Sequence, residues 1–400
     1  MNNKTSQPCV FLTSNQYKPN IGGIENSLYH LGQEYKNLGY QVVIIASDLN
    51  PENKELCEFE DEDGVTIYRY KAKQGSGFLG FAKHALNAIR LYKKLLKLYQ
   101  PQVTICRFHF NLVLLKVVGY KNIVYLVPGV VENETRASLQ IQNSVIGLVK
   151  SKLSFALHKT MQKLAFSFTD KLFVFSENMR DQIRRINRTK PIYICKPGVS
   201  LARFTILKRS EKLIRRESLG IKTAGPVFFC IGRFVKAKGF DTAIKALHSL
   251  NDSSAQLWLL GEGPEEAELK KLSHELQVSE QIKFLGRQSC PEKYYQAADF
   301  FIMSSTYEPL GQTILEALAC GLPIIAAKSS TSIITATSEM LSETKNILLE
   351  EYSPTAFSAA MQNYISLSEL AYESFQVENR DLAESKFSWL KLAKELATYD

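Results

Sequence analysis

The residues best suited to chemistry are two glutamates, Glu308 and Glu316, in an E-x7-E arrangement around a proline and glycine turn. Apolar spacing after the turn predicts a helix that begins there. The amides of Gly311, Gln312 and Thr313 would then lie at a helix N-terminus, which favours a phosphate oxygen. Carboxylates accept hydrogen bonds from hydroxyls instead. The pattern therefore indicates a ligand with sugar hydroxyls at both ends and phosphate between them, as in a nucleotide-sugar.

The elements that would position these glutamates form a predicted βαβ unit. An apolar run at 300–303 predicts a buried strand, and a second apolar run follows Gly321 and Pro323. The second half of the chain repeats this alternation of strands and helices. Its strands are expected near Val227, Leu257, Ile282, Phe300, Ile324 and Ile347. Such a pattern predicts a mostly parallel, doubly wound sheet.

Two cations follow the first strand of this half. Arg233 comes directly after Gly232, and Lys238 directly precedes Gly239. A fixed guanidinium and a mobile ammonium that converge on a diphosphate would neutralise its charge as it departs. The sequence therefore places cations, helix amides and carboxylates in one half of the chain.

Taken together, these motifs closely resemble glycosyltransferase family four, a retaining family with the two-domain GT-B fold. The resemblance is carried by GRFVKAKG at 232–239, GEGP at 261–264, FLG at 284–286 and the EPLG, LEALA and GLP motifs within 298–326. Ordinary turns explain any one of them, but not four in the family's order and roughly its spacing. The implied fold is α/β, with two Rossmann-like doubly wound parallel-sheet domains that face each other across a cleft.

The resemblance also implies roles for the matching residues. Arg233 and Lys238 would stabilise the leaving diphosphate. Glu308 would bind the transferred sugar, Glu316 would bind the ribose, and the backbone at 284–287 would receive the nucleobase. The expected donor-binding residues are Gly22, Gly23, Gly232, Arg287, Gly311, Gln312, Thr313 and Glu316.

The implied reaction is transfer of a sugar from a nucleotide-sugar donor to an acceptor hydroxyl with retention of anomeric configuration. Retaining glycosidases use a close carboxylate nucleophile. Neither glutamate has that evident role here, which favours front-face transfer, in which the departing diphosphate helps to deprotonate the acceptor. No metal is expected, and no cofactor beyond the donor substrate.

Three other functions would use parts of the same sequence pattern. A GT-B nucleotide-sugar epimerase would keep the donor site but need no second substrate, and a non-catalytic scaffold subunit would bind the sugar-nucleotide without turnover. A dehydrogenase is disfavoured. The G-x-G-x-x-G at 75–80 lacks the acidic residue about 20 positions later that a dinucleotide ribose needs.

The first half supplies the expected acceptor side. The pair Gly22 and Gly23 separates a strand at 8–15 from a helix, and the family has a glycine pair here, near the donor phosphates and the acceptor. The resemblance implies an acceptor-binding domain at 1–204, a nucleotide-sugar-binding domain at 205–378 and a C-terminal helix within 379–400 that crosses back to the first domain.

Two residues compete for the acceptor hydroxyl. His109 is expected at the end of a strand at 103–110, where ligands gather in open α/β sheets, although a lone histidine can equally be a packing residue. Many family members have a histidine where this chain has Pro128-Gly129. Some lipopolysaccharide-core glycosyltransferases have a similar pair followed by an acid, which suggests Glu132 as a base or hydroxyl orienter.

The net charge of +9 lies in the first half, which has 27 Lys and Arg against 15 Asp and Glu through residue 200. No acidic residue occurs from Gly64 to Val131, and basic helices are expected at 81–99 and 144–168. An anionic membrane surface or a phosphorylated acceptor is the expected neighbour. A merely solvated basic face is the alternative, and nucleic acid is disfavoured because no binding motif accompanies the charge. A lipid-linked acceptor of surface polysaccharide or lipopolysaccharide assembly fits this face.

Composition predicts a cytoplasmic protein, peripheral on the inner face of the cytoplasmic membrane if the basic helices bind lipid. No apolar stretch approaches the roughly 20 residues of a membrane span, and the N-terminus lacks the apolar run of a signal peptide. The seven cysteines are scattered without a C-x-x-C pair and are expected to be reduced. The D-x-D at 61–63 would hold a metal in a different glycosyltransferase fold, but here it predicts a solvated turn.

Overall fold

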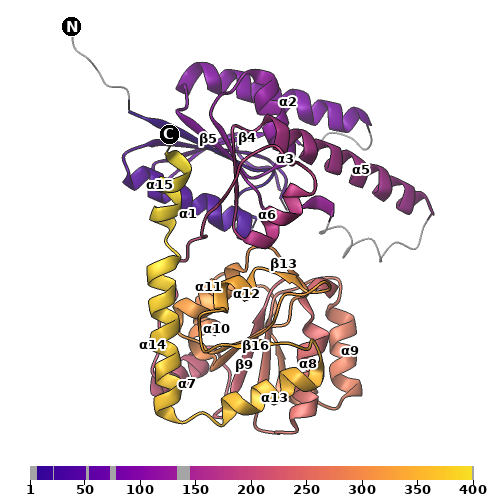
Figure 1. Cartoon of the computed structure of the whole chain (residues 1–400), viewed down its shortest axis with the longest axis vertical. Helices are drawn as coiled ribbons and strands as arrows, with labels where there is room; N and C mark the ends of the chain where they lie inside the picture. The colour runs from indigo at the N-terminus through magenta and orange to yellow at the C-terminus, as the bar shows by residue number, and fades with distance from the viewer. Residues whose placement is uncertain (1–6, 21, 51–53, 73–77, 133–144, 399–400) are drawn as a thin grey trace. The chain divides into compact units, whose positions relative to one another are not determined.

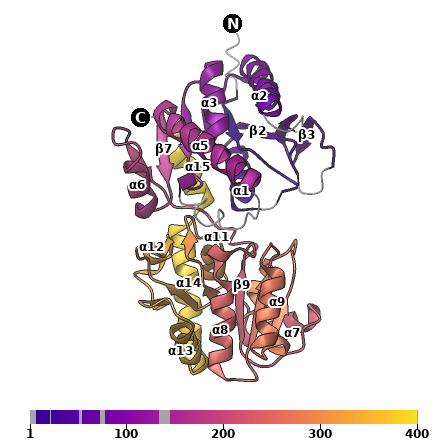
Figure 2. The ribbon, with the colours of Figure 1, turned by 90° about the vertical axis from the view of Figure 1, so that its right-hand side faces the viewer.

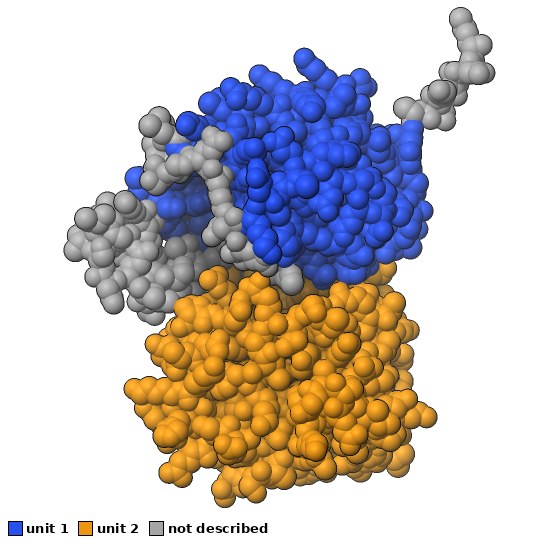
Figure 3. All heavy atoms as spheres, turned by 180° about the vertical axis from the view of Figure 1, so that it is seen from behind, with its two compact units in different colours: residues 1–195, 389–400 blue, residues 196–388 orange. Residues whose placement is uncertain are grey.

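The structure is a computed structural model that describes residues 7–20, 22–50, 54–72, 78–132 and 145–398 (Figure 1). The chain divides into two compact units, which Figure 3 colours separately. Unit 1 comprises Met1–Cys195 and Trp389–Asp400, and unit 2 comprises Lys196–Ser388. The boundary follows Cys195 rather than residue 204, because Val199 and Phe204 pack in the core of unit 2. Most of the glycine-rich segment at 75–80 lies outside the described residues.

Unit 1 contains an eight-stranded sheet in the order β3-β4-β2-β1-β5-β6-β7-β8. Every neighbouring pair is parallel except β3 and β4. The strands are β1 Cys9–Thr13, β2 Gln41–Ser47, β3 Phe59–Glu62, β4 Val65–Tyr70, β5 Val103–Cys106, β6 Ile123–Leu126, β7 Lys171–Val174 and β8 Ile192–Ile194. Strands β2 and β5 lie on opposite sides of β1, so the winding direction reverses between β1 and β5. Ligands of open α/β sheets bind at such switch points, beyond the carboxyl ends of the strands.

Helices cover both faces of this sheet. They are α1 Gly23–Asn37, α2 Phe78–Tyr99, α3 His109–Val118, α5 Val145–Phe168, α6 Glu177–Arg184 and α15 Trp389–Ala397. One face packs Phe11 against Tyr92 of α2 and Leu112 of α3. On the other face, Gly32 of α1 lies beside Ile44 of β2. Strands buried on both faces are continuous apolar runs, which is why the sequence alone reveals them.

The end of the chain packs on unit 1. Helix α15 lies beside α1 (Figure 1). The Tyr35 hydroxyl donates a hydrogen bond of 2.7 Å to the Ala393 carbonyl, and the rings of His30 and Trp389 stack with centroids 5.2 Å apart. These contacts join residues from opposite ends of the sequence.

The D-x-D at 61–63 lies at the tip of a hairpin formed by the antiparallel strands β3 and β4. Asp63 and Gly64 both have positive φ, 52° and 74°, as the primed turns of tight hairpins require. Asp61 accepts a hydrogen bond of 3.1 Å from the Gly64 amide, and Glu60 pairs with Arg69 at 2.7 Å. These carboxylates therefore support the hairpin itself.

Unit 2 contains a six-stranded parallel sheet in the order β11-β10-β9-β12-β14-β16. Its strands are β9 Val227–Ile231, β10 Gln256–Leu260, β11 Ile282–Phe284, β12 Phe300–Met303, β14 Ile324–Ala327 and β16 Ile347–Leu349. All six predicted strands are present. A small sheet that the sequence did not predict pairs β13 Tyr307–Glu308 with β15 Ile334–Thr335.

Helices lie on both faces of this sheet (Figure 2), and alternate strand residues belong to two separate apolar clusters. The helices are α7 Arg209–Ser218, α8 Phe240–Leu250, α9 Glu266–Glu275, α10 Glu292–Ala297, α11 Gln312–Ala319, α12 Thr337–Leu341, α13 Pro354–Ile365 and α14 Glu369–Lys386, with short 3₁₀ helices η2 Lys236–Lys238 and η3 Ser279–Gln281. Phe229 and Phe301 pack toward α10 and α11, whereas Phe228 and Ile302 pack toward α8 and α13. Among the described residues, no helix is both long and apolar enough to cross a bilayer.

A buried ion pair fixes α7 to the sheet of unit 2. Asp299 Oδ2 accepts hydrogen bonds from Arg216 Nη2 at 2.7 Å and from the Val227 amide at 2.8 Å. The Arg216 side chain is only 3% exposed, and its Nε donates to the Ala297 carbonyl. Removing one partner of such a pair leaves a buried charge without compensation.

We therefore expect Asp299→Ala to lower the free energy of unfolding of unit 2 by about 3–5 kcal/mol. Chemical denaturation followed by tryptophan fluorescence measures this in a W389F background, where Trp258 of unit 2 is the remaining tryptophan. Glu350→Ala is the matched control, because it removes an exposed pair with Lys328 and should leave the midpoint unchanged. A D299A midpoint equal to that of E350A would contradict the importance of this anchor.

Candidate active site

The loops at the carboxyl ends of β9, β10 and β11 touch backbone to backbone. The Gly232 amide donates to the Leu260 carbonyl at 3.0 Å, and the Gly261 amide donates to the Gly286 carbonyl at 2.9 Å. A Cβ on Gly261 would lie 2.0 Å from the Gly232 carbonyl oxygen, and the φ of Gly261 is 140°. The glycines of three sequence motifs therefore permit one close junction at this edge of the sheet.

Lys238 lies in η2, directly after this junction. Its ammonium forms an ion pair with Glu308 Oε2, and the two side chains are 21% and 13% exposed. The lysine stem passes over Gly232, where a Cβ would lie 3.3 Å from Lys238 Cε. Gly232 has a φ of 152°, a conformation that other residues rarely adopt. The glycine before Arg233 therefore leaves room for the stem of Lys238.

Glu308 also contacts the start of α11. Its Oε1 accepts a hydrogen bond of 3.3 Å from the Gly311 amide, while its Oε2 holds Lys238. Gly311 caps the helix with a φ of 73°, and the amides of Gln312 and Thr313 belong to its first turn, which has no i−4 acceptors. The structure thus brings a cation and a helix N-terminus together, which suit an anion, beside a carboxylate, which suits hydroxyl groups.

Glu316 lies on the second turn of α11 and is 9% exposed. Its Oε2 accepts a hydrogen bond of 2.8 Å from the Tyr295 hydroxyl. Burial raises the pKa of Glu316 to about 7, although the Tyr295 hydrogen bond opposes the rise. The side chain can therefore change protonation state near neutral pH. The sequence did not predict the contact of Tyr295 with Glu316, because nothing in the pair Tyr294-Tyr295 indicates which of the two rings faces α11.

Among the described contacts, the side chains of three further predicted donor-side residues do not bond to Lys238 or Glu308. Arg233 is exposed, and no hydrogen bond or ion pair of its guanidinium is found within the described ranges. Arg287 pairs with Glu262, and both are about half exposed. Gln312 Nε2 donates to the Gly198 carbonyl at 3.1 Å. Their roles toward a ligand stay predictions.

The glycine pair of unit 1 opens α1. Gly22 is the N-cap, with no side-chain hydrogen bond to the helix, and Gly23 is the first helical residue. A Cβ on Gly22 would lie 2.6 Å from Glu25 Oε2. The Glu25 carboxylate therefore folds back over the start of its own helix.

His109 does not end a strand as predicted. Strand β5 ends at Cys106, and His109 is the first residue of α3. It is 6% exposed, and its Nε2 lies 2.8 Å from Nδ1 of His158 on α5. Burial, and then the neighbouring His158, lower the pKa of His109 to about 3, so the ring is neutral at physiological pH.

Glu132, the competing acceptor-side candidate, is partly buried. It pairs with Lys159 of α5 at 2.9 Å. Neither His158 nor Lys159 was predicted as a partner, because α5 is remote in sequence. A role at the acceptor remains a prediction for both Glu132 and His109.

Two family models match the chain. The model of Glycosyltransferase Family 4 matches residues 21–203, and the model of Glycosyl transferases group 1 matches residues 211–375. The first match lies mostly in unit 1 and the second lies within unit 2. The chain belongs to the family four, group 1 glycosyltransferases.

Relatives of this glycosyltransferase include lipopolysaccharide core biosynthesis glycosyltransferase LpsE of Rhizobium meliloti. It is 41% identical over 116 residues, which are 29% of this chain and 34% of LpsE. The match thus spans about a third of that relative. An uncharacterized glycosyltransferase of Methanocaldococcus jannaschii is 26% identical over 95% of this chain and 94% of its own length.

Solved structures confirm the predicted GT-B fold for this glycosyltransferase. Sucrose-phosphate synthase from Thermosynechococcus elongatus superposes with a TM-score of 0.79 at 18% identity, over 98% of this chain and 97% of the other. Anabaena HepE in complex with UDP-glucose gives a TM-score of 0.75 at 15% identity, over 97% and 98% of the two chains. At such identities the likeness establishes the fold alone.

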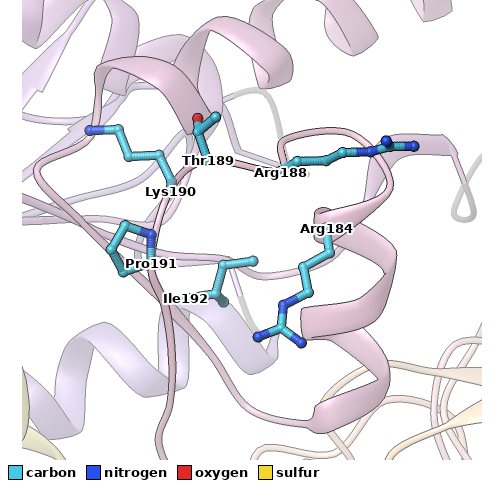
Figure 4. Close-up of a pocket in the computed structure, with 6 residues that line it drawn as sticks. All are labelled: Arg184, Arg188, Thr189, Lys190, Pro191 and Ile192. Atoms are coloured by element: carbon cyan, nitrogen blue, oxygen red, sulfur yellow. The ribbon is translucent and has the colours of Figure 1, made fainter.

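One pocket of this glycosyltransferase is lined by several cationic side chains that do not converge on one point. It is lined by Arg184, Arg188, Thr189, Lys190, Pro191 and Ile192. Figure 4 shows Arg188 and Lys190 pointing in opposite directions. Lys190 Nζ donates to the Thr169 carbonyl at 2.7 Å. The pocket therefore presents no convergent site for one anion.

Metal ligands do not cluster in the part of this glycosyltransferase that the structure describes, where no group of three or more His, Cys, Asp or Glu could hold an ion. The independence from metal stays a prediction. Five of the seven cysteines are buried.

The raised pKa of Glu316 predicts a dependence of stability on pH. In the folded chain Glu316 keeps its proton up to about pH 7, whereas in the unfolded chain a glutamate loses its proton at about pH 4.3. Between these values the folded state binds more protons than the unfolded state, so stability falls as pH rises. Glu316→Gln cannot titrate. As the pH rises through this interval, the free energy of unfolding of E316Q minus that of the parent should increase by up to about 1.4 kcal/mol per pH unit.

Chemical denaturation of both proteins over a pH series measures the difference. Tyr295→Phe is the matched control, because it removes the hydrogen bond that opposes the rise and should keep the downward slope. Parallel stability curves for E316Q and the parent would contradict a titrating Glu316.

Proposed function

We propose that this glycosyltransferase transfers a monosaccharide from a nucleotide-sugar to an acceptor hydroxyl with retention of anomeric configuration and without a metal. The observation that carries the proposal is the contact of Lys238 with Glu308 at the start of α11. A cation and helix amides suit a diphosphate, and a carboxylate suits sugar hydroxyls. Family membership and the UDP-glucose bound to HepE support this choice of donor class.

The ion pair of Lys238 with Glu308 suggests how the donor would bind. Without a ligand, the two charges neutralise each other in a partly buried position. A diphosphate at the N-terminus of α11 would compete for the ammonium and the Gly311 amide. Glu308 would then be released toward the hydroxyls of the transferred sugar. Binding of the donor thus replaces one set of charge-assisted hydrogen bonds by another.

The chemical step follows from the charge that develops on the leaving group. The bond from the anomeric carbon to the phosphate oxygen breaks, and a bond to the acceptor oxygen forms on the same face. The acceptor proton passes to the departing diphosphate. Lys238 and Arg233 would stabilise that charge, which is the largest contribution a site of this kind can make. Glu316 would accept a hydrogen bond from the ribose with its remaining oxygen.

Two neighbouring lysines, Lys238 and Lys236, provide a test of this mechanism and its control. Lys238→Met should lower kcat by about 100-fold or more, because it removes the cation that neutralises the leaving group. Lys236→Met is the matched control, since Lys236 lies two positions earlier, is 61% exposed and pairs with Glu265. It should turn over as the parent does.

The measurement is acceptor-dependent release of nucleotide, after a thermal-shift screen over UDP-, GDP- and ADP-sugars has chosen the donor. Release without acceptor would favour an epimerase, and binding without release would favour a scaffold subunit. Equal kcat for K238M and K236M would refute the role given to Lys238.

For the acceptor we propose a lipid-linked or lipopolysaccharide substrate. The similarity to a lipopolysaccharide core glycosyltransferase supports this class. So does the surface of α2, which carries exposed basic and apolar side chains together. These are Lys83, Arg90, Lys93, Lys94 and Lys97 with Phe81, Leu86 and Leu98. A basic helix with exposed apolar residues can lie on anionic headgroups.

Reversing two charges on α2 tests the membrane proposal. Lys93→Glu with Lys94→Glu should abolish co-sedimentation with vesicles that contain an anionic phospholipid, because like charges then face the lipid. Lys270→Glu with Lys271→Glu is the matched control on α9 of unit 2, with the same change in net charge. Binding of the parent to purely zwitterionic vesicles, or equal loss in both variants, would contradict a specific role of α2.

A further inference from the structure

The hydroxyl of Tyr295 lies between two acceptors on α11. It is 2.8 Å from Glu316 Oε2 and 3.1 Å from the Thr313 carbonyl oxygen. A phenol has one proton, so Tyr295 can donate fully to only one of these oxygens at a time. An ionised carboxylate is a stronger acceptor than a neutral carbonyl. Tyr295 therefore donates to Glu316 whenever that carboxylate is charged.

The ring of Tyr295 is fixed in the core of unit 2. It is 0% exposed and packs against three other rings. The ring of Phe301 stacks on it with centroids 5.6 Å apart. The rings of Phe204 and Phe229 are nearly perpendicular to it, at 5.5 Å and 4.9 Å. Because such cores are close-packed, these neighbours determine where the hydroxyl of Tyr295 lies.

Glu316 has a second carboxylate oxygen that Tyr295 does not use. Among the described contacts, a hydrogen bond reaches Oε2 of Glu316 and none reaches Oε1. The terminal torsion of a glutamate is broad, so a carboxylate without a partner samples many orientations. The bond from Tyr295 therefore selects one orientation and leaves Oε1 for a ligand.

Other titratable groups act on this pair of residues through their charge alone. In the described chain they are Arg203, Glu292, Glu308 and Cys320. Arg203 and Glu292 act on Glu316 with opposite sign and pair with each other at 2.8 Å. Burial raises the pKa of the Cys320 thiol, which is therefore neutral. The hydrogen bond from Tyr295 is thus the specific local influence on the Glu316 carboxylate.

We propose that Tyr295 is a positioning residue for the donor, which holds Oε2 of Glu316 so that Oε1 accepts a hydrogen bond from the ribose. This inference rests on the proposed function, in which Glu316 binds the ribose, and adds the residue that orients Glu316. Tyr295 acts through Glu316, because its own ring is enclosed in the core. It contributes to recognition of the ribose and not to the bond that is transferred.

The same contact links donor binding to a proton. Burial raises the pKa of Glu316 to about 7, and the hydrogen bond from Tyr295 opposes this rise. A protonated Glu316 can instead donate to Tyr295, whose own proton then turns toward the Thr313 carbonyl. Because a neutral acid is a weaker acceptor than a carboxylate, binding of the ribose should weaken as pH falls below about 7.

The experiment compares nucleotides that differ in the ribose alone. UDP, GDP and ADP and their 2′,3′-dideoxy analogues are titrated into the full chain by isothermal titration calorimetry. The parent should prefer the ribonucleotide that it binds to the dideoxy analogue. Tyr295→Phe should bind that ribonucleotide about threefold to tenfold more weakly, but the analogue as the parent does. A general packing defect would weaken binding of both.

Two further variants show whether Tyr295 acts through Glu316. Tyr294→Phe is the matched control on α10, because no hydrogen bond of the Tyr294 hydroxyl is found among the described residues. It should keep the full preference for the ribonucleotide. In a Glu316→Ala background this preference should be lost, and Tyr295→Phe should then cause no additional loss.

A pH series provides a second readout that packing alone would not change. Between about pH 5.5 and about pH 9, the preference of the parent for the ribonucleotide should rise with a midpoint at about 7. The midpoint should move upward in Y295F, because the hydrogen bond that lowers the pKa of Glu316 is gone. The phosphates of the nucleotide titrate alike with every variant, so they cancel in the comparison.

The outcomes separate this inference from the proposed function. Equal ribose preference in Y295F and the parent, an unmoved midpoint, or additional loss in the E316A background overturns the role of Tyr295 alone. Equal weakening of both nucleotides in Y295F overturns it as well. A parent that binds none of these nucleotides contradicts the proposed function itself, and the inference then fails with it.

Discussion

The ion pair of Lys238 with Glu308 is the interaction around which unit 2 is arranged. Glu308 holds the ammonium with one oxygen and the first amide of α11 with the other. Both side chains are mostly buried, and each would be an uncompensated charge without the other. The contact therefore compensates both charges at the carboxyl edge of the sheet. A donor diphosphate would exchange with this internal partner.

Close backbone approach makes that contact possible. Lys238 reaches Glu308 by passing over Gly232, and the loops after β9, β10 and β11 meet through Gly232, Gly261 and Gly286. A side chain at Gly261 would collide with the neighbouring carbonyl and separate the loops. The loops can approach so closely because these glycines have no Cβ, and their positive φ values are ones that other residues rarely adopt.

The two units share one electrostatic principle. In each, a helix that follows a sheet strand begins with a glycine N-cap, a glutamate carboxylate lies close to the helix start, and a cation interacts electrostatically with that carboxylate. In unit 2 the cation is Lys238, in direct contact with Glu308. In unit 1 it is Arg107, whose guanidinium is buried without a partner among the described residues.

The sequence by itself determined the parallel sheets, the family and the helix entered at Gly311. Apolar runs identify strands buried on both faces, and glycines mark turns whatever the surrounding structure is. It also singled out Lys238, Glu308 and Glu316 as residues of one site, through motifs whose spacing is local. It placed the end of β5 too far along the chain, because Phe108 and Phe110 continue an apolar pattern that α3 buries just as well.

Only the tertiary structure decided which charges are paired and which are not. Tyr295 on Glu316, His158 on His109 and Lys159 on Glu132 each come from helices distant in sequence. Whether an arginine at the end of an apolar strand is solvated, paired or isolated depends on which strands and helices surround it. Arg107 is fully buried, and it directly follows β5, which pairs with β1 in the interior of the sheet.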